Sequence, residues 1–225
     1  MGVKKSGRRA RSRQVEDFSN VSTFSGSVRI SRDFLLAGAS LVALGALAAP
    51  DRTHAACSGP NQTISTQTTG PILGNGGVIT VTATGNVTRS GGVTGSDGVD
   101  VTGCPARTLA NSGTITGGAG SARKGEAAGG AGVSNSGTIG SLNNSGTISG
   151  GGAGSVSGNA TGGAGVSNSG AITKLTNRGA ISGGDSSSIR GAATPGDAIY
   201  SAGAKASIGT IANSGSIVGK VVIDK

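Results

Sequence analysis

The second half of the chain repeats a short pattern of polar, small and aliphatic positions. Each copy reads Asn-x-Gly-x-Ile. The copies begin at Asn111, Asn135, Asn144, Asn168, Asn177 and Asn213. The intervals are 24, 9, 24, 9 and 36 residues, so two interleaved series each advance by 33 residues. A fixed period of this length indicates a structural repeat rather than random low complexity.

The repeat predicts an all-β chain of short parallel strands. Asn and Gly tolerate the left-handed backbone of a tight corner, and the Thr-Ile or Ala-Ile that follows can begin a strand. Equivalent segments align in register only if the chain winds the same way each time, which predicts a parallel β-solenoid with a 33-residue repeat. The period is compatible with one large coil or with two small coils per repeat. The glycine-rich stretches 117–132 and 151–165 are expected to be loops on one side.

Stacking of equivalent coils would place the isoleucines in inward-facing ladders. Each fully buried aliphatic side chain contributes about 1.5 to 3 kcal/mol relative to exposure. We expect one ladder of Ile115, Ile148, Ile181 and Ile217, and a second of Ile139, Ile172 and Ile208, with Leu109, Leu142, Leu175 and Ile211 beside them.

The composition excludes a conventional globular core. The chain has 45 Gly, no Trp, one Tyr and three Phe, and from Ala56 onward its only aromatic residue is Tyr200. Gly and Pro make up 44 of the last 170 residues, which reaches the range where chains without a period are disordered. A secreted, largely disordered glycine-rich protein is therefore the alternative to the solenoid.

The N-terminal 55 residues resemble an extended signal peptide. Residues 34–49 form an uncharged apolar run that is short for a membrane span but typical of a signal-peptide core, and a long basic stretch precedes it. Cleavage is expected after Ala55, leaving Ala56 as the new N-terminus, with Ala48 as a second option. We expect the leader to engage Sec-type export machinery. A Tat-like route stays open, although only Arg32 lies next to the apolar run.

Export to an oxidising compartment changes what the two cysteines mean. Cys57 and Cys104 are the only cysteines, and we expect them to form a disulfide. A loop of that size would add roughly 4 kcal/mol of stability on the chain-entropy model. The expected organisation is a signal peptide over 1–55, an N-terminal cap segment over 56–108, and glycine-rich solenoid repeats over 109–225.

The charged residues point away from catalysis and from nucleic acid. Nine of the 19 Lys and Arg residues precede residue 56, and the rest of the chain carries ten bases and six acids without clustering. Dispersed bases without stacking aromatics make a poor nucleic-acid site. Asp97 and Asp100 could form a carboxylate pair, but their sequence is typical of a turn followed by a strand. We expect no enzyme activity, no metal site and no cofactor.

These features together resemble the passenger domains of autotransporters, the type V secreted proteins of Gram-negative bacteria. The resemblance is carried by the basic leader, the Cys57-Ser-Gly-Pro start, the Asn-Ser-Gly-Thr-Ile repeats and the segment 198–217. It implies a right-handed parallel β-helix at the cell surface or outer membrane, or secreted, for display or adhesion to a host or neighbouring-cell surface. The family ends in a membrane β-barrel, whereas this chain stops at Lys225 after a repeat. We therefore expect a fragment, with the barrel as its missing partner, or the product of a truncated autotransporter gene.

Overall fold

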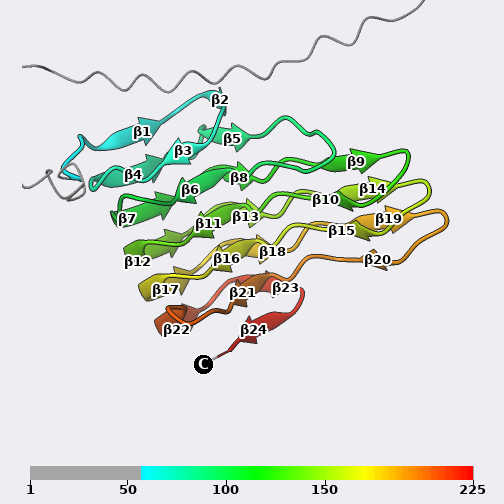
Figure 1. Cartoon of the computed structure of the whole chain (residues 1–225). Helices are drawn as coiled ribbons and strands as arrows, with labels where there is room; N and C mark the ends of the chain where they lie inside the picture. Colours follow the sequence, from blue (N-terminus) through cyan, green and yellow to red (C-terminus); the bar gives the residue numbers. More distant parts are fainter. Residues whose placement is uncertain (1–56, 225) are drawn as a thin grey trace, which may run out of the picture. The chain divides into compact units, whose positions relative to one another are not determined.

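The computed structural model describes residues 57–224, which contain 24 β-strands and no helix. Three sheets each contain six parallel strands (Figure 1). The first sheet contains β1 (Gln62–Ile64), β4 (Val78–Val81), β7 (Ala106–Asn111), β12 (Thr138–Asn144), β17 (Ala171–Asn177) and β22 (Ser207–Asn213). The second contains β2 (Gln67–Thr69), β5 (Asn86–Thr88), β8 (Thr114–Thr116), β13 (Thr147–Ser149), β18 (Ala180–Ser182) and β23 (Ser216–Val218). The third contains β3 (Ile72–Leu73), β6 (Val99–Val101), β11 (Val133–Asn135), β16 (Val166–Asn168), β21 (Ile199–Ser201) and β24 (Val221–Ile223).

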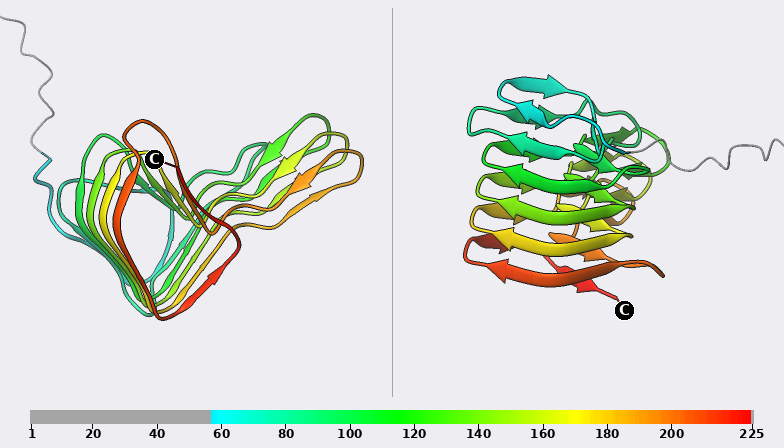
Figure 2. Two further views of the ribbon diagram at one scale, coloured as in Figure 1. Left: turned by 90° about the horizontal axis from the view of Figure 1, so that it is seen from below. Right: turned by 90° about the vertical axis from the view of Figure 1, so that its left-hand side faces the viewer.

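Two further sheets of three parallel strands form a lateral arm (Figure 2). The outgoing sheet contains β9 (Gly120–Ala122), β14 (Ala153–Ser155) and β19 (Ser186–Ser188). The returning sheet contains β10 (Ala127–Ala128), β15 (Ala160–Thr161) and β20 (Ala193–Thr194). A full coil visits the first sheet, the second sheet, the arm and the third sheet in turn. The prediction of an all-β parallel solenoid is confirmed, and the 33-residue repeat forms one large coil.

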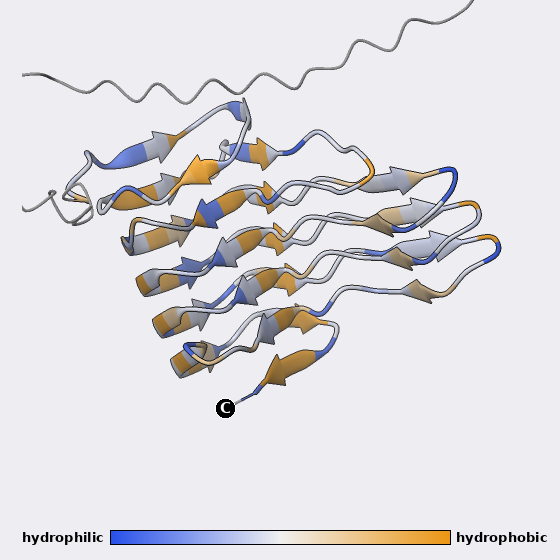
Figure 3. Ribbon diagram, viewed as in Figure 1, coloured by the Kyte–Doolittle hydropathy of each residue, from blue (hydrophilic) through white to orange (hydrophobic). Residues whose placement is uncertain are grey.

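The aliphatic residues of successive coils stack in continuous rows inside the three sheets. Ile115, Ile148, Ile181 and Ile217 are register partners in the second sheet, and Ile139, Ile172 and Ile208 are partners in the first. Leu109, Leu142, Leu175 and Ile211 form a neighbouring row. Apart from Ile208, Ile211 and Ile217, which are partly buried, these side chains are at most 1% exposed. Figure 3 shows the corresponding hydrophobic bands along the strands.

The first coils use the same rows without the repeat motif. Ile79 pairs with Leu109, Val87 with Ile115 and Val99 with Val133, and all of these side chains are fully buried. The strands within residues 56–108 therefore belong to the same three sheets as the repeats. Alternating aliphatic residues are enough to form these strands without the repeat motif, because each short strand has only one buried face.

The motif glycines do not adopt the left-handed backbone that we expected at the corners, and for them that expectation is wrong. Gly146 and its equivalents have no positive φ angle. Glycine is needed because a Cβ on Gly146 would overlap the carbonyl oxygen of Gly113 in the preceding coil. The close stacking of coils therefore requires glycine at this position. The sequence of a single motif does not reveal this requirement.

The asparagine side chains point inward and form buried ladders. Asn111 Nδ2 donates to Asn144 Oδ1, Asn144 Nδ2 to Asn177 Oδ1, and Asn177 Nδ2 to Asn213 Oδ1, each at 2.8 Å. At another corner, Asn135 Nδ2 donates to Asn168 Oδ1 at 2.7 Å. Each of these four donor amides also donates to a backbone carbonyl of the following coil, as Asn144 does to Ala180 at 2.9 Å. The ladders thus give partners to polar groups that the tight corners bury, except for Asn135 Oδ1, which has none within the described residues.

The glycine-rich stretches contain short strands joined by turns, where we expected only loops, and they do lie on one side. Between the two arm sheets, a small core of alanines is buried: Ala122, Ala127, Ala153 and Ala160. Small side chains at these positions let two sheets approach closely enough to exclude water. Register stacking against identical neighbours therefore turns a sequence with few strand-forming residues into strands.

The arm joins the coil through a narrow waist in which outgoing and returning glycines hydrogen bond to each other. Gly151 N donates to Gly130 O at 2.8 Å, Gly163 N to Gly151 O at 2.8 Å, and Gly184 N to Gly163 O at 2.8 Å. The same zigzag extends to Gly118 and Gly196. A Cβ on Gly163 would overlap Gly130 O, so side chains cannot enter the waist.

Candidate functional site: the groove between arm and coil

A groove of about 490 Å³ lies where the returning sheet of the arm meets the third sheet, and we call it the elbow groove. Its floor consists of the small residues that connect the two sheets, including Gly162, Gly163 and Gly196. Its length runs from Asp97 to Asp197, across several successive coils. The volume lies in the usual range of small-ligand sites, which is roughly 300 to 1,000 Å³.

Two rows of hydroxyl groups face each other across the elbow groove. Thr161 and Thr194 are register partners on the arm wall, and both are exposed. Ser134 and Ser167 are register partners on the wall made by the third sheet. No hydrogen bond joins any of these four side chains to another group within residues 57–224.

Tyr200 continues the serine row, because it is the register partner of Ser167 in the next coil. Its side chain lies on the outer face of the third sheet and is 42% exposed. Lys220 lies beyond it at the same end of the groove. An exposed aromatic ring therefore closes a wall that is otherwise built from hydroxyl groups.

Asp97 and Asp197 occupy equivalent positions in different coils. Ala131 and Ala164 stand between them in the same row, so three coil spacings of about 4.8 Å separate the two residues by roughly 14 Å. Paired carboxylates of glycoside hydrolases lie about 5 to 9.5 Å apart. One Asp97 oxygen also accepts the Ala131 backbone N–H at 2.7 Å, and Asp100 accepts the Thr102 hydroxyl. This geometry suits binding rather than paired-carboxylate hydrolysis.

The tip of the arm is a second exposed surface. Arg123, Lys124 and Arg190 lie there with the exposed Val156 and Ile189. The tip turns are held by buried or half-buried serine hydroxyls. The Ser155 hydroxyl donates to Gly125 O at 2.9 Å, and the Ser188 hydroxyl donates to Gly158 O at 2.7 Å. The tip is thus an ordered surface with basic and aliphatic side chains.

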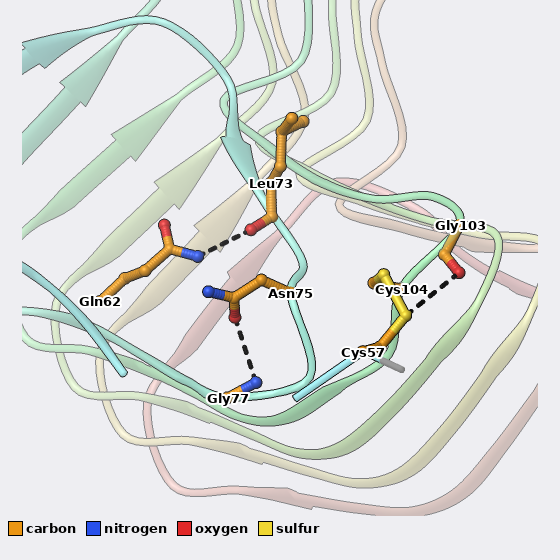
Figure 4. The surroundings of a disulfide bond; sticks show 7 residues. All are labelled: Cys57, Gln62, Leu73, Asn75, Gly77, Gly103 and Cys104. Carbon is orange, nitrogen blue, oxygen red and sulfur yellow. Dashed lines mark hydrogen bonds between the residues drawn. A yellow bond between two sulfur atoms is a disulfide. The ribbon is translucent and has the colours of Figure 1, made fainter. Parts of the chain in front are cut away.

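A disulfide joins Cys57 to Cys104, whose Cα atoms are 5.5 Å apart (Figure 4). It ties the segment before β1 to the connection between β6 and β7. Nearby, Asn75 Nδ2 donates to Pro60 O at 2.9 Å, and Gly77 N donates to Asn75 Oδ1 at 3.1 Å. The cross-link and these amides fasten the first coil to those that follow it.

Of the residues singled out from the sequence, Asp97 lines the elbow groove, whereas the ladder and disulfide residues lie away from it. The ladder isoleucines are in the core and the two cysteines are at the first coils. Ala55, Ala56 and the apolar run 34–49 lie outside the described residues. The sequence analysis missed the groove because Thr161 and the glycines of the floor come from stretches expected to be loops. The recurrence of Ser134 with Ser167, and of Thr161 with Thr194, at the 33-residue period was the available signal.

Within residues 57–224, no cluster of three or more His, Cys, Asp or Glu side chains is placed to bind a metal. In the same range, no helix is long and apolar enough to cross a membrane. No protein-family model, no curated protein and no solved structure matches this chain. The β-solenoid is consistent with a passenger-like fold.

Proposed function

We propose that the chain is an exported, non-catalytic β-solenoid that displays the arm and the elbow groove outside a Gram-negative cell, as an adhesin-like passenger. The observation that carries the proposal is the arm. Three consecutive coils, β9–β10, β14–β15 and β19–β20, extend in register away from the core and present an ordered tip. The three six-stranded sheets would bury the isoleucine and asparagine ladders even without the arm. The arm is therefore not needed for the core, and its surface is available for contact with a partner.

Two further features support this function. The leader, with its basic stretch and apolar run 34–49, has the composition of a signal peptide. The Cys57–Cys104 disulfide is of a kind that persists in oxidising compartments. A largely disordered filler, the alternative, does not fit coils that stack from Gln62 to Ile223.

The test is expression of the full coding sequence in a Gram-negative host, with an epitope inserted after the exposed Gly125 at the arm tip. We expect antibody to label intact cells or to detect the epitope in the medium, and thiol-trapping mass spectrometry to find Cys57 and Cys104 oxidised. The matched control carries Leu44→Arg in the apolar run, which would keep the epitope inside the cell. Retention of the unaltered chain in the cytoplasm with reduced cysteines would contradict the proposal.

A further inference from the structure

We infer that the elbow groove binds a neutral, linear, equatorially linked glycan, extended along the solenoid axis. The inference rests on the proposed function only in naming what the displayed surface contacts. It starts from unpaired hydrogen-bonding groups. Each hydroxyl of Thr161, Thr194, Ser134 and Ser167 can both donate and accept, and none is used within residues 57–224. A ligand that carries many hydroxyl groups is the natural complement.

The spacing of these groups selects a polymer over a compact molecule. Parallel strands of successive coils lie about 4.8 Å apart, so the threonine row and the serine row each repeat at that interval. An extended, equatorially linked hexopyranose chain advances by nearly the same distance per sugar. The coil of Thr161 and Ser167 offers one hydroxyl from each wall, the preceding coil offers Ser134, and the following coil offers Thr194 opposite Tyr200. Successive sugars can therefore each meet at least one hydroxyl group of the groove.

Tyr200 supplies the apolar contact that sugar recognition also needs. Its ring follows the serine row and is 42% exposed. An aromatic ring offers a large, rigid contact surface at low conformational cost, and its face can stack against the C–H face of a pyranose. The floor of the groove also favours close contact. Gly162 and Gly163 have no side chain that would separate the ligand from the backbone.

The charges in the groove argue against a polyanionic glycan. Asp97 and Asp197 contribute two carboxylates, against the single ammonium of Lys220. An anionic polymer would meet the Asp97 carboxylate at one end, while Lys220 offsets Asp197 at the other. The two carboxylates still outnumber the ammonium group, and like-charge contacts disfavour a partner. The basic arm tip lies at the far end of the arm strands and is not part of the groove lining.

The experiment measures binding in solution to the oxidised chain purified from cells expressing the full coding sequence. Tyr200 is the only tyrosine, and the chain has no tryptophan, so intrinsic tyrosine emission reports directly on the groove. We expect cellohexaose to change this emission saturably. A polygalacturonate hexamer and the axially linked maltohexaose should bind at least about tenfold more weakly.

Two matched substitutions locate the site. Thr161→Arg places a large side chain in the groove, whereas Thr147→Arg makes the same change at an exposed threonine of β13 in the second sheet. We expect Thr161→Arg to weaken cellohexaose binding at least about tenfold and Thr147→Arg to leave it unchanged. By calorimetry, Tyr200→Ala should weaken binding about tenfold, the loss typical of a central aromatic contact, while Tyr200→Phe retains it. Unchanged circular dichroism of each variant would show that the fold is intact.

Absence of binding, preference for the polyanion, or equal losses in the two arginine variants would overturn the inference. Because this assay uses purified protein, its outcome is separate from that of display. A displayed chain that binds no glycan refutes the groove assignment alone. A chain that binds cellohexaose but stays in the cytoplasm refutes the proposed function alone.

Discussion

Removing one amide from the middle of the asparagine ladder should destabilise the protein much more than removing the amide at its end. Asn144 is 2% exposed, and its Nδ2 is the only hydrogen-bond donor to Asn177 Oδ1 within the described residues. Asn144→Ala therefore leaves a fully buried acceptor unsatisfied, because Asn177 is 0% exposed. Asn111 keeps two other acceptors, Gly113 O at 3.3 Å and Thr147 O at 3.0 Å.

The size of the effect follows from these contacts. An unsatisfied buried acceptor costs about 1 to 3 kcal/mol, and each further lost hydrogen bond about 1 kcal/mol. We expect Asn144→Ala to lower the free energy of unfolding by about 3 kcal/mol, a large share of the 5 to 15 kcal/mol typical of domains. At a urea dependence of about 2 kcal/mol/M, the unfolding midpoint would fall by about 1.5 M.

Asn213→Ala is the matched control, since it removes the same side chain where the ladder ends. Asn213 is exposed, and Asn177 Nδ2 keeps its bonds to Ser216 O and Gly179 O. Water can replace what is lost, so a cost below about 1 kcal/mol is expected. Urea unfolding followed by circular dichroism measures both variants. Equal midpoints for the two would refute the reasoning that the ladder stabilises through buried amide contacts.

Three further changes test other parts of the fold by the same assay. Gly163→Ala in the waist should cost about 2 to 3 kcal/mol, whereas Gly154→Ala, whose Cβ meets only a hydroxyl at 3.7 Å, should stabilise by about 0.4 to 1 kcal/mol. Comparable effects would contradict the steric role of the waist. In Val101→Asn, the new amide could donate to the unsatisfied Asn135 Oδ1 of the next coil. The loss in free energy of unfolding should therefore be about 1 to 2 kcal/mol smaller than for an asparagine that is buried without a hydrogen-bond partner. Cys104→Ala should lower stability by roughly 4 kcal/mol and abolish the effect of reductant, and an unchanged response to reductant would exclude a role for the disulfide.

The 33-residue period, and with it the direction of stacking, can be read from the sequence alone. Because equivalent residues of a solenoid must lie above one another, the 33-residue interval was enough to place Ile115 over Ile148 and Leu142 over Leu175. The sequence also predicted the pairing of the only two cysteines, since two thiols can form only one intramolecular disulfide. These conclusions need only repetition and composition, both of which are visible in one dimension.

Only the tertiary structure decided what the small residues do. A motif read alone suggests that Gly146 serves a corner, yet its role is to let the Gly113 carbonyl of another coil approach. Likewise, the stretch 117–132 has too few apolar residues to predict strands, and it forms them because register partners lie on the neighbouring coils. The elbow groove exists for the same reason, because Thr161 and Ser167 come to line its two walls only after the arm has folded. Contacts between coils depend on distances across the stack, and those distances are fixed only when all coils are in place.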